Sequence, residues 1–148
     1  MPNWVSSCLI FDNEEEAKKV YDGMQWNGKR FSFKAVCPHP VDRSDCPAEY
    51  DQNNVPGNCE SEKKPWFNWY KWNIDHWGCK WDCSFVTVDE NKITFITPWE
   101  PPNDKLLQTI ADVFKTRFTI KAWDETEDSN GEPLMFPTRQ FMNKHLTP

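Results

Sequence analysis

The sequence predicts an α+β fold, in which two main helices pack on one face of an antiparallel sheet. Two segments carry apolar residues at the three- and four-residue spacing of amphipathic helices. Shorter runs of β-branched and aromatic residues lie before, between and after them and indicate strands. The chain has 148 residues, which is a usual length for one domain and enough to bury a core without a metal or a disulfide.

The first half begins with a predicted strand over residues 3–11. Asp12, followed three residues later by Glu15, indicates a capping box and therefore the start of a helix. The apolar face of this helix consists of Ala17, Val20, Tyr21 and Met24. Asn27-Gly28 predicts its end. Alternating apolar residues over 31–35 then predict a second strand.

Residues 37–64 differ in character from the rest of the chain. Prolines, cysteines and polar residues replace the regular apolar pattern, which predicts an irregular inserted loop. The segment that follows, 65–81, is dense in aromatic residues. Pro65 suits the first position of a helix, so we expect a short helix near 66–75.

The second half predicts a hairpin, a helix and a last strand. Two β-rich runs, 83–88 and 93–97, flank a loop of four residues. Asn103 is the expected N-cap of the next helix. The apolar face of that helix consists of Leu106, Ile110, Val113 and Phe114. Residues 118–122 predict the last strand, and we expect the acidic tail from Asp124 to be partly loose.

The order of elements is therefore strand, helix, strand, insert, strand, strand, helix and strand. A sandwich with the order β-α-β-β-α-β contains most of these elements. The prediction has five strands where the simplest such sandwich has four. One of the five is accordingly an extra edge strand or a wrong assignment.

Charge and hydropathy exclude several classes of partner. The formal net charge of −6 argues against binding to duplex nucleic acid, because phosphate binding requires clustered Lys and Arg. No apolar run approaches the roughly 18 residues that span a bilayer, so we expect no membrane partner. The start of the chain does not resemble a secretory signal. The six cysteines are then expected to be free thiols in a reducing compartment.

The cysteines also permit a zinc site. Zinc requires four sulfur or nitrogen ligands, usually including a close pair, and Cys79 and Cys83 have that spacing. Cys37, Cys46, Cys59 and His39 would supply further ligands. The chain has no pair of Cys-x-x-Cys knuckles, so small core residues and incidental loop thiols are the simpler explanation. We expect no bound metal or other cofactor.

Catalytic motifs are weak. A nucleophile needs a neighbouring base, and His76 lies three residues before Cys79. Gly78 opposes a helix between them, and no orienting motif follows. The chain has no Gly-rich phosphate loop and no isolated acid–base pair of carboxylates. We therefore expect a binding protein and not an enzyme.

The surplus of tryptophan is the strongest functional signal. Nine tryptophans exceed what one small core usually holds, and lysines lie among them. Bases stack on aromatic rings and lysine contacts phosphate, which suits a nucleotide, a cyclic dinucleotide or a short single strand. The alternative is that the rings form core and the lysines extend over them, which is favoured for Trp77 and Trp81. The expected ligand-binding residues are Trp66, Trp69, Lys71, Trp72, His76, Trp77, Lys80, Trp81 and Trp99.

Four short segments together resemble one protein family. They are Met1-Pro2-Asn3-Trp4-Val5, Phe31-Ser32-Phe33 running into Pro38 and Pro40, Trp77-Gly78-Cys79-Lys80-Trp81, and Thr94-Phe95 through Trp99 to Pro101 and Pro102. These segments are similar to the phage- and plasmid-encoded YubB-type ferredoxin-like domain family. The third is the most specific, because it resembles the family's Trp-Gly-Thr-Lys-Trp signature. Cys79 in place of threonine and the 37–64 insert depart from the family pattern.

The resemblance implies a ferredoxin-like sandwich over residues 1–125, with an insert at 37–82 and a C-terminal tail at 126–148. The name describes a topology and not an iron–sulfur cluster. The family has no established general activity, and its members come from mobile elements, most often bacteriophages. We therefore expect a phage accessory protein in the cytoplasm of the infected bacterial host, where it counters defence or modulates the host. It would bind a host protein or sequester a nucleotide-type ligand. The alternatives are a nucleotide-acting enzyme and a phage structural or assembly protein, and the sequence does not specify the oligomeric state.

Overall fold

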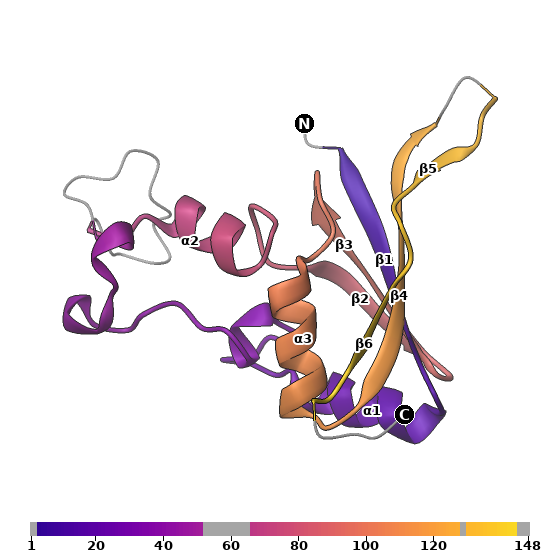
Figure 1. Ribbon diagram of the computed structural model, residues 1–148, viewed down its shortest axis with the longest axis horizontal. Helices are drawn as coiled ribbons and strands as arrows, with labels where there is room; N and C mark the ends of the chain where they lie inside the picture. Colours follow the sequence, from indigo (N-terminus) through magenta and orange to yellow (C-terminus); the bar gives the residue numbers. More distant parts are fainter. Residues whose placement is uncertain (1–2, 52–65, 128–129, 145–148) are drawn as a thin grey trace.

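The computed structural model describes residues 3–51, 66–127 and 130–144. It confirms the α+β class: a twisted antiparallel sheet has helices against one face, and the inserted segment projects away from it (Figure 1). The strands are β1 Trp4–Phe11, β2 Ser84–Asp89, β3 Lys92–Pro98, β4 Arg117–Glu127, β5 Pro133–Met135 and β6 Arg139–Met142. The α-helices are α1 Glu14–Gly23, α2 Trp69–His76 and α3 Asp104–Val113.

The described strands form one six-stranded sheet in the order β2-β3-β1-β4-β5, and β6 pairs with β4 as well. Strand β1 is central, because Leu9 lies opposite Ile93 of β3 on one side and opposite Ile120 of β4 on the other. The β2–β3 hairpin therefore occupies one half of the sheet. Strand β4 and the C-terminal strands occupy the other half.

The core lies between one face of this sheet and the helices α1 and α3. Leu9 and Ile120 from the sheet pack in one buried cluster with Val20 of α1 and Ile110 of α3. The alternation of a strand places the next residues on the opposite face, which no helix of the described chain covers (Figure 1). No helix among the described residues is long and apolar enough to cross a membrane.

Helix α1 differs from the prediction at both ends. Its N-cap is Asn13 and not Asp12: the Oδ1 atom of Asn13 accepts a hydrogen bond of 2.9 Å from the backbone N–H of Glu16. The helix ends at Gly23. Asn27-Gly28 forms a separate turn after it, in which both residues have positive φ, a conformation that asparagine and glycine tolerate best.

The strand predicted over 31–35 is wrong. Phe33–Ala35 form a short 3₁₀ turn, although Phe31 and Phe33 are buried in the core. The backbone N–H of Ser32 donates to the carbonyl of Met24 (2.8 Å), and that of Phe33 donates to the Asp82 carboxylate (2.9 Å). These amides are therefore satisfied away from the sheet, and the segment closes one end of the core.

The predicted hairpin is confirmed, with a tighter turn than expected. Asp89 pairs with Lys92, so only Glu90 and Asn91 connect β2 and β3. Glu90 has a φ of +54°, as a two-residue hairpin turn requires. The four-residue loop was therefore too long by the two residues that pair.

Helix α3 follows the prediction closely. Asn103 is its N-cap, since its Oδ1 atom accepts from the backbone N–H of Leu106 at 2.9 Å. Leu106 and Ile110 are buried as expected, whereas Val113 is exposed. The apolar face of α3 therefore no longer points into the core at Val113, the last residue of the helix.

The tail from Asp124 is not loose in its described part. Strand β4 continues to Glu127, and the chain returns as β5 and β6 along the outer edge of β4. Phe141 lies opposite Phe118, and their ring centroids are 5.7 Å apart. Pairing of the free edge and burial of this ring explain why the segment is ordered. Residues 128–129 and 145–148 lie outside the described residues.

The insert is irregular where it is described, as predicted. Its two short 3₁₀ turns, Arg43–Asp45 and Ala48–Tyr50, lead towards a second small core of aromatic residues beside α2. The helix expected near 66–75 is confirmed as α2, but Asn68 caps it by accepting from the backbone N–H of Lys71 (3.1 Å). The predicted role of Pro65 and the thiol of Cys59 lie outside the described residues.

Candidate functional site

The nine predicted ligand-binding residues do not form one surface. Trp77 is 1% exposed and belongs to the main core. Its indole N–H donates to the carbonyl of Cys37 (3.1 Å), and its ring stacks on His39 with centroids 5.1 Å apart. Trp77 therefore ties the insert to the core, and its ring is not on the surface where a ligand was expected.

Five of the nine residues lie in or beside the small core of the insert. They are Trp66, Trp69, Lys71, Trp72 and His76. Trp72 is buried between Tyr50 and His76, and its ring centroid lies 4.0 Å from that of His76. Lys71 forms an ion pair with Asp75 (2.7 Å). Aromatic packing in the insert core and the Lys71–Asp75 ion pair therefore explain where these five side chains lie.

Cys79 and His76, the weak catalytic pair in the sequence, are poorly suited to catalysis. The Cys79 thiol is buried, and burial raises its pKa, so the thiol is the stable form. Burial followed by the nearby Lys105 ammonium lowers the pKa of His76. The ammonium of Lys105 donates to Nδ1 of His76 (3.2 Å), so this nitrogen is already occupied.

The remaining three residues meet at the surface. The Lys80 ammonium nitrogen lies 4.7 Å from the Trp81 ring centroid, 5.6 Å from that of Trp99 and 5.7 Å from that of Tyr70. These three rings are 40%, 45% and 50% exposed respectively. We call this group, Tyr70, Lys80, Trp81 and Trp99, the Lys80 cage. Such a surface offers ring faces and one positive charge together.

The Lys80 charge is not neutralised by an acidic side chain of the described residues. Across the described ranges of the chain, no carboxylate forms an ion pair with Lys80, whereas Lys71 and Lys29 pair with Asp75 and Asp82. The rings attract the ammonium through their quadrupoles but carry no net charge. The cage therefore presents a cation within a chain whose overall charge is −6.

Trp99 is held in a sparsely populated backbone conformation. Its φ is +62°, and the backbone N–H of Glu100 donates to the carbonyl of Pro98 (2.7 Å) across it, which is the hydrogen bond of a γ-turn. The backbone N–H of Trp99 donates to the carbonyl of Asn3 (2.7 Å). Strain of this kind concentrates at functional sites, and here it directs a large ring outwards.

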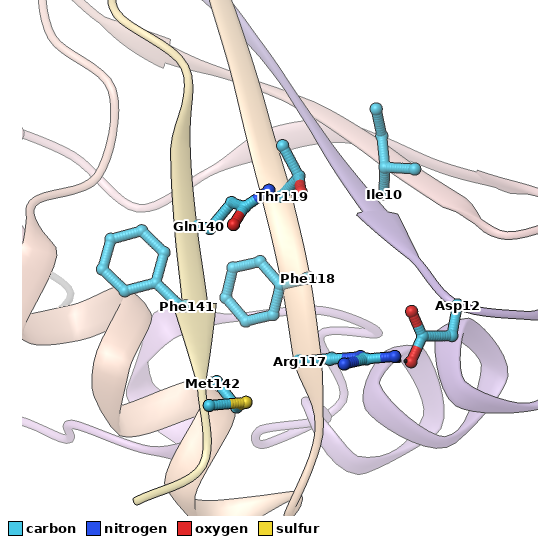
Figure 2. A pocket seen from close by; sticks show the side chains of 8 residues that line it. All are labelled: Ile10, Asp12, Arg117, Phe118, Thr119, Gln140, Phe141 and Met142. Atoms are coloured by element: carbon cyan, nitrogen blue, oxygen red, sulfur yellow. Dashed lines mark hydrogen bonds and ion pairs between the residues drawn. The ribbon is translucent and has the colours of Figure 1, made fainter. Parts of the chain in front are cut away.

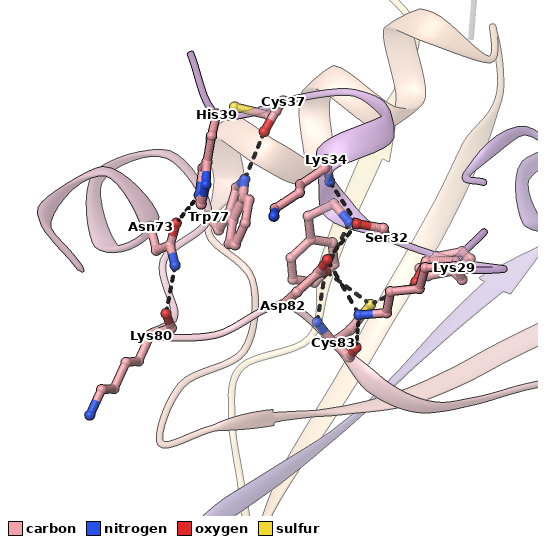
Figure 3. A network of polar contacts seen from close by, with 12 residues as sticks. Lys29, Ser32, Lys34, Cys37, His39, Asn73, Trp77, Lys80, Asp82 and Cys83 are labelled. Carbon is pink, nitrogen blue, oxygen red and sulfur yellow. Dashed lines mark hydrogen bonds and ion pairs between the residues drawn. The ribbon is translucent and has the colours of Figure 1, made fainter. Parts of the chain in front are cut away.

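The segment that carries Lys80 is fixed by the end of α2. Gly78, with a φ of +85°, turns the chain, and the side-chain amide of Asn73 donates to the carbonyl of Lys80 (2.7 Å). His39 in turn donates through Nε2 to Oδ1 of Asn73 (2.7 Å). Figure 3 shows that these bonds hold the main chain while the Lys80 side chain points away from the network.

Asp82 fixes the other end of this segment. Its carboxylate accepts from the backbone N–H groups of Phe33 and Cys83 (both 2.9 Å) and from the Ser32 hydroxyl. The Lys29 ammonium lies 3.3 Å from the same carboxylate (Figure 3). Four donors from two distant segments thus converge on one side chain, which joins the loop at 29–33 to the start of β2.

Two aromatic residues of the surface were missed in the sequence. Tyr70 belongs to the aromatic run at 65–81, and its spacing gave no reason to separate it from the rings of the insert core. Trp4 was assigned only to a strand, yet its ring centroid lies 6.5 Å from that of Trp81, which lies 6.4 Å from that of Trp99. We call Trp99, Trp81 and Trp4 the indole row.

A separate pocket lies at the other end of the uncovered face. It has a volume of about 540 Å³, and Figure 2 shows its lining from β1, β4 and β6. Arg117 points towards Asp12, and its Nε atom lies 2.7 Å from the carboxylate. Because this pair neutralises the guanidinium, the pocket offers a ligand less unpaired charge than the Lys80 cage does.

The cysteines do not assemble a metal site in the part of the chain that is described. Cys8, Cys37, Cys79 and Cys83 are free thiols, and the Cys46 thiol donates to the carbonyl of Pro47 (3.4 Å). No group of three or more His, Cys, Asp or Glu side chains is placed to hold a metal ion among residues 3–51, 66–127 and 130–144. Cys79 and Cys83 are core residues there, and burial raises the pKa of both thiols.

Comparison of the chain with protein-family profiles, with curated proteins and with solved structures finds no match.

Proposed function

We propose that this chain is a non-catalytic binding protein whose Lys80 cage holds a planar, anionic ligand of the nucleotide type. The observation that carries this proposal is the Lys80 ammonium among three exposed rings, with no carboxylate partner in the described part of the chain. A base stacks on an exposed ring, and a phosphate takes the lysine charge. The Lys80 cage offers both interactions together. The backbone of the segment that carries Lys80 is held by hydrogen bonds of the Asn73 and Asp82 side chains.

The geometry of Cys79 and His76 supports binding over catalysis. A nucleophilic cysteine works as a thiolate in a partly exposed, electropositive setting. Cys79 is instead buried with a raised pKa, and His76 contacts Lys105. An enzyme that acts on nucleotides through other residues is the alternative, and turnover of the bound ligand would reveal it.

We further propose that the fold is a ferredoxin-like sandwich with additions. The strand order β4-β1-β3-β2 and the two helices α1 and α3 in one core support this assignment. The insert with α2 and the C-terminal strands β5 and β6 are then additions to a β-α-β-β-α-β unit.

The biological role that we propose is that of a phage accessory protein in the cytoplasm of an infected bacterium. The support is the resemblance to the YubB-type family, carried above all by Trp77-Gly78-Cys79-Lys80-Trp81. Sequestering a nucleotide-type signal would counter a host defence or modulate the host without chemistry. The Lys80 cage is the part of the surface that we assign to that task.

A host protein is the second candidate ligand. Phe85 of β2 is 83% exposed and has a φ of +52° at a break in the β2–β3 register. Breaks of this kind redirect side chains, and exposed aromatic residues are frequent anchors in protein interfaces. Phe85 would supply such an anchor near the sheet edge.

Titration calorimetry with ATP, GTP and cyclic dinucleotides tests the proposal. We expect binding of at least one of them, and Lys80→Gln and Trp81→Ala should each weaken it about tenfold, the effect of losing one stacked base or one charge contact. Lys18→Gln, on the exposed side of α1, is the matched control and should leave the affinity as it is. No binding at millimolar ligand, or equal affinities of Lys80→Gln and Lys18→Gln, would refute the proposed function.

A further inference from the structure

The indole row is longer than one nucleotide needs. The Trp99 and Trp81 planes are inclined by 34°, and those of Trp81 and Trp4 by 36°. A lone base stacks on one ring face, and Lys80 takes one phosphate. Trp4 is therefore unexplained by a mononucleotide, although its ring continues the same surface.

Strand register extends the row onto the uncovered face of the sheet. Ser6 of β1 lies opposite Trp123 of β4, and residues two apart on a strand share a face. Trp4 and Trp123 therefore share a face at diagonal positions on neighbouring strands, a distance that large rings bridge. Ala122, which precedes Trp123, is buried on the core side, so Trp123 belongs to the uncovered face.

A second lysine lies further along this face. Lys121 is opposite Cys8 of β1 and is exposed. In the described part of the chain no carboxylate pairs with Lys121, whereas Arg117 on the same strand is paired with Asp12. Glu125 lies on the same face, two residues beyond Trp123 and one position beyond the Val5–Asp124 pair, which puts it level with Trp4. The surface formed by the indole row and Trp123 thus has one lysine, Lys80, at the cage and another, Lys121, on the sheet.

We propose that the ligand of this surface is a single-stranded nucleic acid. Its bases stack in succession on the indole row and Trp123, and its backbone phosphates contact Lys80 and Lys121. The inference rests on the proposed function and specifies its ligand. A duplex would not serve, because its base faces are already stacked, whereas aromatic rings that follow one another suit a strand with exposed bases.

Fluorescence anisotropy with labelled oligonucleotides tests the inference. The probes are oligo-dT and oligo-U of two, four and eight nucleotides, a duplex of equal length, and ATP or UTP as competitors. We expect affinity to rise about tenfold or more from two to four nucleotides, as each added base finds a ring. The duplex should bind at least about tenfold more weakly, since its bases are not available for stacking. The dT and U probes distinguish DNA from RNA as the source of the strand.

Variants separate this inference from the proposed function. Trp123→Ala and Lys121→Gln should each lower the ratio of oligonucleotide to mononucleotide affinity at least about fivefold, because a stacking or phosphate contact is lost. Val113→Ala, at an exposed apolar residue of α3 outside the row, is the control and should keep the ratio. If nucleotides bind but the affinity is independent of length, or Trp123→Ala and Lys121→Gln both keep the ratio, the inference fails while the proposed function stands. If neither nucleotides nor oligonucleotides bind, both fail.

Discussion

The ammonium nitrogen of Lys80 lies 5.6 Å from the ring centroid of Trp99, although the whole β2–β3 hairpin separates them in the chain. Lys80 precedes β2, and Trp99 follows β3. Antiparallel pairing brings the two open ends of a hairpin together, and Trp81 and Trp99 then face the same cation. The cage is therefore a product of strand pairing, and changes that alter either end of the hairpin should alter binding.

The conformation of Trp99 predicts an unusual order of stabilities. Trp99→Gly and Trp99→Ala both remove the ring, but only glycine adopts a φ of +62° without a Cβ clash. We expect the glycine variant to be more stable than the alanine variant by about 1 kcal/mol in urea denaturation, and both to lose ligand binding. A more stable alanine variant would show that the positive φ does not hold in solution.

Two glycines allow the strain at Gly78 to be measured against a control. Both Gly78 and Gly28 have positive φ, +85° and +86°, but a Cβ at Gly78 would lie 2.7 Å from the backbone nitrogen of Asn103, and one at Gly28 would have no neighbour within 4 Å. Gly28→Ala should cost about 1 kcal/mol through backbone strain alone. Gly78→Ala should cost clearly more in urea denaturation, because the N-cap of α3 must also move. Equal costs would contradict the close contact.

Asp82 should be the most sensitive polar residue near the cage. Asp82→Ala leaves the backbone N–H groups of Phe33 and Cys83 without their acceptor, and we expect a loss of about 2–4 kcal/mol. Ser32→Ala removes one donor and keeps the carboxylate bonded, so about 1 kcal/mol is expected. Denaturant titration of both variants checks the order. Similar losses of stability in the two variants would mean that Asp82 stabilises the fold through the Ser32 hydroxyl and not through the two backbone amides.

Stability should decrease as the pH falls from 7.5 to 5.5, in part through His76. Burial and Lys105 lower the pKa of His76, whose ordinary value is about 6.5. Between the lowered pKa and that value the unfolded chain binds a proton that the folded chain does not, so acid favours unfolding. His76→Gln should show a smaller pH dependence in urea denaturation. Lys105→Gln should raise the pKa of His76 in an NMR titration, and an unchanged midpoint would contradict their contact.

The C-terminal strands should contribute to global stability. Phe141 packs against Phe118 and is largely buried, so Phe141→Ala should cost about 3 kcal/mol. Met135→Ala, on the exposed part of β5, should cost no more than about 0.5 kcal/mol. Hydrogen exchange should show protected amides along the β4 edge in the wild type. Rapid exchange of the β4 amides that face β6 would indicate the loose tail expected from the sequence.

Elements with strong local patterns were predicted well. Asn103 and the periodic apolar residues after it were sufficient to place α3, and the β-rich runs around Asp89 to Lys92 were sufficient for the hairpin. The strand predicted from Phe31 and Phe33 was wrong because alternating burial also occurs in a loop. The backbone amides of this loop donate to Met24 and Asp82 and not to a neighbouring strand. The prediction for the tail was wrong because its short segments, which contain prolines, become ordered only by pairing with the edge of β4.

For the candidate site, local pattern alone indicated that the chain carries more aromatic residues than its core needs and that Lys80 lies among them. The local pattern did not separate Trp77, which is 1% exposed, from Trp81, which is 40% exposed, because both occur in one short sequence segment. Only the tertiary structure made that separation and brought in Trp4 and Trp99. The physical reason is that burial and ring contacts depend on which distant strands pair, and pairing between β1 and β3 places these residues at one end of the sheet.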